Sequence, residues 1–145
     1  FILLIFLQLI IGAFVSGMDA GKIYNSWPMM GSNFFPDDSR YNEFLSLKVF
    51  DNPSIVQFLH RLLAYLIIVN YIYLLILAFK ETNKVVLKPV LIIGIILLFQ
   101  VGLGILTILS GVKIVYASLH QINSIFIILS TLYFLYISKY NKAIN

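Results

Sequence analysis

Four long apolar stretches separated by polar segments dominate this sequence. They cover residues 1–17, 55–79, 90–109 and 115–137. About 20 apolar residues cross the hydrocarbon core of a bilayer, so each of the last three is long enough for a membrane-spanning helix. The first is somewhat short and the chain opens inside it, so we expect a fourth span with upstream sequence missing. Because backbone groups in lipid must bond to one another, all four should be helical.

This pattern predicts an all-α fold, an integral membrane four-helix bundle, as one domain over residues 1–145. Composition supports it, with 61% hydrophobic and 11% charged residues, against about 45–50% and about 25% in soluble domains. The absence of cysteine excludes disulfides, thiolate metal sites and cysteine nucleophiles. The sequence has no basic stripe with interleaved aromatic residues, so we expect no nucleic-acid binding.

Basic residues are unevenly distributed among the connecting segments. The short turn 80–89 carries three lysines and one acidic residue, and the tail carries Lys139 and Lys142. The long loop 18–54 carries five acidic and three basic residues. Positive residues of short loops stay on the cytoplasmic side, so we expect this turn and both termini on the cytoplasmic or matrix side and the long loop outside. A bacterial plasma membrane and a mitochondrial inner membrane fit equally well.

The two histidines occupy matching positions. His60 and His120 each lie about four residues into a span that runs inward from the outer side. At about 1.5 Å rise per residue, both would lie roughly 6 Å below the outer boundary. Haem iron accepts histidine as an axial ligand, and Ala64 and Ser124, one turn deeper, would leave room for a flat macrocycle. The pair favours a bis-histidine haem site over two interfacial histidines, and a zinc site would need further ligands.

Positive charge near these histidines could receive the haem propionates. Arg61 follows the first histidine directly, and Lys113 lies in the turn before the last span. Together with the helix N-termini, these groups would attract carboxylates at the outer surface. The simpler interpretation of Arg61 is that its side chain reaches up to the lipid headgroups.

The first and third spans share a pattern of polar and small residues along one helix face. In each span a glutamine is followed four residues later by a glycine. The two sets are Gln8, Gly12 and Ser16, and Gln100, Gly104, Thr107 and Gly111. Small residues let membrane helices approach closely, so ordinary packing explains them, and we expect Gly104 to face a neighbouring helix.

Four motifs in this chain resemble those of the haem A synthase family. Residues 12–31, GAFVSGMDAGKIYNSWPMMG, are similar to the entry to the second half of that family. Residues 52–61 are similar to its next His-Arg motif, and residues 100–107 and 119–121 to its last two. Their order and spacing agree with the family over nearly the whole chain.

The resemblance implies an eight-span enzyme of two four-helix halves, which oxidises the C8 methyl group of haem O to a formyl group and so makes haem A for terminal oxidases. This chain would be the C-terminal half, which holds a haem b cofactor. His60 and His120 would be the axial ligands of its iron, and Arg61, Gln121 and Lys113 would also bind the cofactor.

The substrate haem and an important outer-loop glutamate would belong to the absent first half, so no catalytic residue is assigned. The expected partners are haem O, the lipid bilayer, haem O synthase or oxidase-assembly proteins, and a second copy of the chain. Two alternatives remain open: a stand-alone electron-transfer cytochrome b with the same histidine pair, and a structural bundle without haem. Upstream sequence would distinguish the synthase from the stand-alone cytochrome. An absorption spectrum would distinguish both haem proteins from a bundle without haem.

Overall fold

The structure, a computed structural model, describes residues 1–44, 46–82 and 84–144, and within these ranges it is helical without any strand. The long helices are α1 (Ile2–Gly17), α3 (Pro53–Lys80), α4 (Leu87–Leu109) and α5 (Ile114–Ile144). The short helical elements are η1 (Ala20–Lys22), α2 (Tyr41–Phe44), η2 (Leu47–Phe50) and η3 (Lys84–Val86). The predicted all-α fold is confirmed.

Three helices, α3, α4 and α5, are long and apolar enough to cross a membrane by length and composition. Within the described ranges α1 is a shorter apolar helix of 16 residues, so a fourth span stays a prediction. Three helix ends lie two or more residues beyond the apolar stretches: α3 begins at residue 53, α4 begins at residue 87 and α5 continues to residue 144. Polar residues at these ends extend the helix without extending the apolar stretch.

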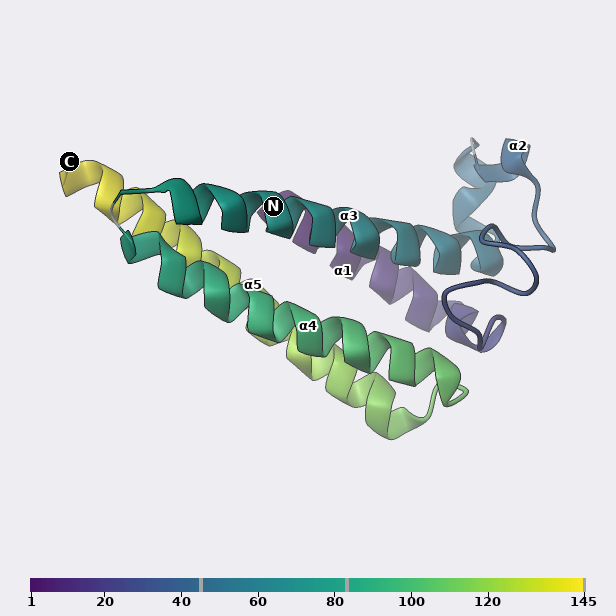
Figure 1. The fold of residues 1–145 in the computed structure, drawn as a ribbon. Helices are drawn as coiled ribbons and strands as arrows, with labels where there is room; N and C mark the ends of the chain where they lie inside the picture. Colours follow the sequence, from purple (N-terminus) through teal and green to yellow (C-terminus); the bar gives the residue numbers. More distant parts are fainter. Residues whose placement is uncertain (45, 83, 145) are drawn as a thin grey trace.

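The helices form two pairs. α1 packs mainly on α3, and α4 mainly on α5. The pairs converge near the α3–α4 turn and the C-terminus, and they diverge toward the long loop (Figure 1). Buried apolar side chains from all four helices join the pairs in one core: Ile5, Ile11, Val56, Leu63, Ile67, Leu97 and Ile127.

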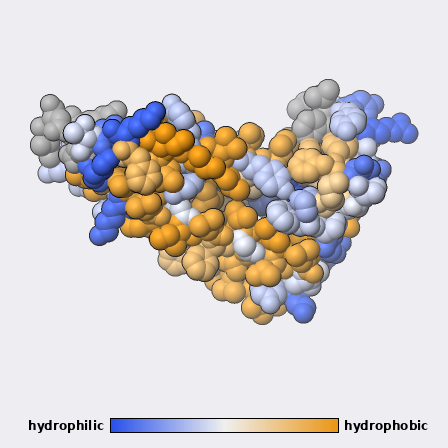
Figure 2. Space-filling model, viewed as in Figure 1, coloured by the Kyte–Doolittle hydropathy of each residue, from blue (hydrophilic) through white to orange (hydrophobic). Residues whose placement is uncertain are grey.

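Many large apolar side chains are exposed on the outer surface of the bundle. Leu98, in the middle of α4, is 76% exposed, and Leu3 on α1 is 80% exposed. Hydrophobic residues cover the middle of the molecule, and hydrophilic residues gather at its two ends (Figure 2). Soluble proteins rarely expose such large contiguous apolar areas, so this surface supports immersion in a bilayer.

The start of α3 is fixed by its local sequence and by the loop before it. The Asn52 side chain accepts hydrogen bonds from the backbone N–H of Ser54 at 3.0 Å and of Ile55 at 3.4 Å. Pro53 occupies the first helical position, where its missing N–H costs nothing. Asp38 accepts a 2.7 Å hydrogen bond from the Ser54 hydroxyl. These contacts attach the loop to the helix that carries His60.

The long loop is folded around its own carboxylates. Gly31 has a φ of +78°, and a Cβ there would collide with the Asp37 carboxylate. That carboxylate accepts hydrogen bonds from the Ser32 backbone N–H at 2.8 Å and from the Asn33 amide at 2.6 Å. The Ser32 N–H, followed by the Asn33 amide, lowers the pKa of Asp37 below its usual value. These hydrogen bonds fix the conformation of the loop around residues 31–37.

Two glycines let the helices approach each other closely. A Cβ on Gly12 of α1 would lie 3.2 Å from His60 Cε1 on α3. A Cβ on Gly104 of α4 would lie 3.0 Å from His120 Cε1 on α5. The prediction that Gly104 faces a neighbouring helix is confirmed, and both glycines place a helix backbone directly against an imidazole ring.

The positions of the segments that connect the helices allow a test of the membrane orientation. The long loop and the α4–α5 turn lie at one end of the bundle, and the α3–α4 turn and C-terminus lie at the other (Figure 1). We expect an alkaline phosphatase fusion to be active at Asn42 and inactive at Asn83, a residue outside the described ranges, because the lysines hold the α3–α4 turn inside. Phosphatase activity at Asn83 would reverse the orientation.

The glycine contacts predict an effect on stability. Gly104→Leu should destabilise the protein by about 1–3 kcal/mol, because the new side chain overpacks the contact with His120. Gly102→Leu is the matched control, since a Cβ at Gly102 meets no atom within 4 Å. Thermal unfolding in detergent measures both. Equal melting temperatures for the two variants would show that Gly104 has no special role in packing.

Candidate functional site

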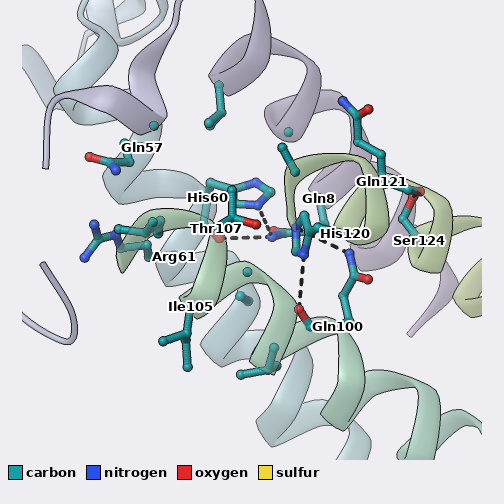
Figure 3. A pocket seen from close by; sticks show the side chains of 18 of the residues that line it. Gln8, Gln57, His60, Arg61, Gln100, Ile105, Thr107, His120, Gln121 and Ser124 are labelled. Atoms are coloured by element: carbon teal, nitrogen blue, oxygen red, sulfur yellow. Dashed lines mark hydrogen bonds between the residues drawn. The ribbon is translucent and has the colours of Figure 1, made fainter. Parts of the chain in front are cut away.

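A cavity of about 440 Å³ lies between the two helix pairs, in the half of the bundle nearest the long loop. All four long helices and the loop contribute to its walls, which are mainly apolar with a few polar groups. Such a combination is typical of sites for flat organic cofactors and other small ligands. Figure 3 shows the polar groups of the wall, with His60 and His120 at its centre.

The structure brings the two histidines together. Their ring centroids are 6.4 Å apart, and their planes meet at 69°. His60 comes from α3 and His120 from α5, and both rings line the cavity. The sequence predicted that the two histidines lie at one depth. The structure shows in addition that their rings are close together, which the spacing in the sequence does not require.

His120 is held by hydrogen bonds on both ring nitrogens. Its Nδ1 lies 3.1 Å from the backbone carbonyl oxygen of Gln100, and its Nε2 lies 3.4 Å from the side-chain Nε2 of the same residue. Asn123 donates to the Gln100 side-chain oxygen at 2.8 Å. Because a carbonyl only accepts and an amide nitrogen only donates, this arrangement places the proton of His120 on Nδ1 and leaves an electron pair on Nε2.

His60 is held less completely. Its Nε2 lies 3.2 Å from the side-chain Nε2 of Gln8, which also donates to the His60 carbonyl oxygen at 3.1 Å. In the structure, His60 Nδ1 and the side-chain oxygen of Gln8 are buried without a hydrogen-bond partner. Each histidine thus has its own glutamine partner on the neighbouring helix, but only His120 has both ring nitrogens bonded.

Arg61 faces the loop instead of lipid headgroups. Its side chain is 6% exposed. Its guanidinium donates to the carbonyl oxygens of Ser26 at 2.9 Å, Met29 at 3.3 Å and Tyr24 at 3.1 Å. Gln57, one turn earlier, also donates to Tyr24 at 3.0 Å. In Figure 3 the side chain of Arg61 extends away from the two imidazoles, so Arg61 fastens the loop at the edge of the cavity.

Of the other predicted site residues, some line the cavity and one does not. Gln121, Ala64 and Ser124 line the cavity. Lys113 is exposed and does not belong to the cavity wall as the structure describes it. Lys22 of the loop lines the cavity, and it forms a 2.8 Å ion pair with an aspartate three residues earlier. The cavity wall therefore contains a cation from the long loop besides Arg61, a position that the sequence analysis did not single out.

Sequence analysis also missed the hydrogen-bond partners of the histidines. The repeat of a glutamine followed by a glycine was interpreted as helix packing. This is right for Gly104, but Gln8 and Gln100 also bond the histidine rings. The identical i, i+4 spacing in two spans was the available signal. Asn123 gave no such signal, because its contact with Gln100 depends on how α4 and α5 are rotated against each other.

Comparison with known proteins places the chain in a family. The family described as cytochrome oxidase assembly protein matches residues 1–132. A heme A synthase of Pelagibacter ubique is 50% identical over 94% of this chain and 39% of its own length.

Two further relatives carry the same name. A heme A synthase of Rickettsia bellii is 43% identical over 86% of this chain, and one of Wolbachia pipientis is 39% identical over 92%. Each match covers 37% of the relative's own length, so the chain spans about two fifths of the curated relatives. No solved structure matches the chain. The family match over nearly its whole length shows that this chain belongs to the cytochrome oxidase assembly protein family.

Proposed function

We propose that this chain is the haem b-binding half of a haem A synthase, with His60 and His120 as the axial ligands of the iron. The observation that carries the proposal is the pair of imidazoles 6.4 Å apart in the wall of one cavity. The similarity to relatives that are named heme A synthase also supports the proposal. A stand-alone electron-transfer cytochrome b could use the same pair, but the family match favours the synthase.

The spacing of the rings suits an iron between them. Two metal–nitrogen bonds of about 2.0–2.1 Å, with about 1.1 Å from each nitrogen to its ring centre, give a centroid separation of about 6.3 Å. The observed separation is 6.4 Å. On both rings the Nε2 faces an amide donor, so both Nε2 atoms carry the electron pair that a metal requires.

The remaining residues suit a flat, partly charged cofactor. Ala64 and Ser124 are small residues of a mainly apolar cavity wall, and Gly12 and Gly104 bring helix backbone against the two rings. Arg61 places positive charge at the loop end of the cavity, where propionates would lie, and Lys22 also lines this end but is paired with Asp19. Gln121 lines the cavity and belongs to the same proposal, together with Lys113 as a more distant cation. When bound, the haem would supply one-electron redox chemistry.

The whole protein would contain a second half. We infer an eight-span enzyme in a bacterial plasma membrane or mitochondrial inner membrane, with the termini of this half on the cytoplasmic or matrix side. Oxidation of the C8 methyl group of haem O would take place in the other half. Haem O synthase, oxidase-assembly proteins and a second copy of the chain are the proposed partners.

An absorption spectrum of the purified protein that contains this chain tests the proposal. The wild type should show the reduced α-band of a low-spin b-type haem. His60→Ala and His120→Ala should each lose the low-spin spectrum, because one axial position opens, while a methionine at either position should restore part of it. Ser130→Ala is the control on α5, since Ser130 bonds the Ile127 carbonyl and lies outside the cavity wall. An unchanged low-spin spectrum in the double alanine variant would refute the ligand assignment.

A further inference from the structure

The two proposed ligands differ in how firmly they are held. We propose that Gln100 and Asn123 form a positioning pair that fixes His120 as the permanent ligand, and that His60 is the exchangeable ligand. This inference rests on the proposed haem site and goes beyond it, because it assigns different roles to two histidines that the sequence presents as equivalent.

The orientation of the Gln100 amide is set by Asn123. The Asn123 amide donates to the Gln100 side-chain oxygen at 2.8 Å and to the Ile96 carbonyl oxygen at 3.1 Å. With its oxygen occupied, Gln100 must turn its NH₂ group toward His120 Nε2. The reverse orientation would favour a proton on Nε2, and a protonated nitrogen cannot bind a metal. Asn123 therefore selects the tautomer of His120 that can bind iron.

His120 would keep an anchor after Nε2 is used for iron. Its Nδ1 donates to the Gln100 backbone carbonyl at 3.1 Å, a contact that does not involve Nε2. A hydrogen bond from the second ring nitrogen to a carbonyl fixes the ring and increases the basicity of a histidine ligand. The side-chain contact with Gln100 would be given up, and the backbone contact would remain.

His60 has no equivalent anchor. Its Nδ1 is buried without a partner, and so is the side-chain oxygen of Gln8. The Gln8 NH₂ group also donates to the His60 backbone carbonyl at 3.1 Å, but no residue bonds its oxygen, whereas Asn123 bonds the oxygen of Gln100. Once Nε2 binds iron, no described hydrogen bond would restrain rotation of the His60 ring. This difference makes His60 the ligand that a small external molecule can replace.

Single histidine variants of the whole protein test the difference. His60→Ala should retain most of its haem as a high-spin species that binds carbon monoxide when reduced, and added imidazole should restore the low-spin spectrum. His120→Ala should retain much less haem. Equal haem retention in both variants, or the reverse order, would overturn the inference. If the wild type contains no low-spin haem at all, the proposed function itself fails.

Variants that keep both histidines provide a second test, in case His120→Ala does not accumulate. Gln100→Leu and Asn123→Leu remove or release the amide that keeps His120 Nε2 unprotonated before iron binds, so each should lower the haem content and raise the high-spin fraction. Gln8→Leu is the matched control on α1 and should change both measurements less. Asn123→Gln should restore part of the low-spin fraction if it recovers the amide contact. A Gln8→Leu effect as large as that of Gln100→Leu would contradict the proposal.

Discussion

Two imidazole rings lie inside an apolar bundle, and their polar nitrogens must find partners there. Buried polar groups without hydrogen bonds are costly, most of all where water is scarce. One glutamine from each neighbouring helix, Gln8 from α1 and Gln100 from α4, bonds the Nε2 of each ring, while His60 Nδ1 is left without a partner. A glycine four residues later brings each helix backbone against the ring that its glutamine bonds. These two contacts hold α1 against α3 and α4 against α5.

The loop end of the bundle depends on a second set of polar contacts. Arg61, directly after His60, uses its guanidinium to hold three loop carbonyls. Asp38 bonds the hydroxyl of Ser54 at the start of the same helix. The loop is thus attached to α3 at two places, at Ser54 in its first turn and at Arg61 about two turns later. Loop residues, Lys22 among them, thereby contribute to the wall of the cavity.

Hydropathy predicted the α-helical class and the positions of the long helices, because the apolar residues needed to cross a bilayer leave a continuous signal. Equal spacing from the loop ends predicted that His60 and His120 lie at one depth. The carbonyl partners of Arg61 could not be predicted, since they come from a loop with no regular hydrogen-bond pattern. The contact between Asn123 and Gln100 depends on helix rotation, which a span of mixed small and large apolar residues does not specify. Helix ends were displaced where polar residues extend a helix beyond the apolar stretch.

An experimental structure of the whole protein, purified with its haem, measures the central claim most directly. We expect one iron between the Nε2 atoms of His60 and His120, with the porphyrin between the α1–α3 and α4–α5 pairs and the His120 Nδ1 still bonded to the Gln100 carbonyl. A haem held by other residues, or a cavity that contains lipid or water while the two imidazoles keep their glutamine partners, would contradict the assignment of this half as a haem-binding domain.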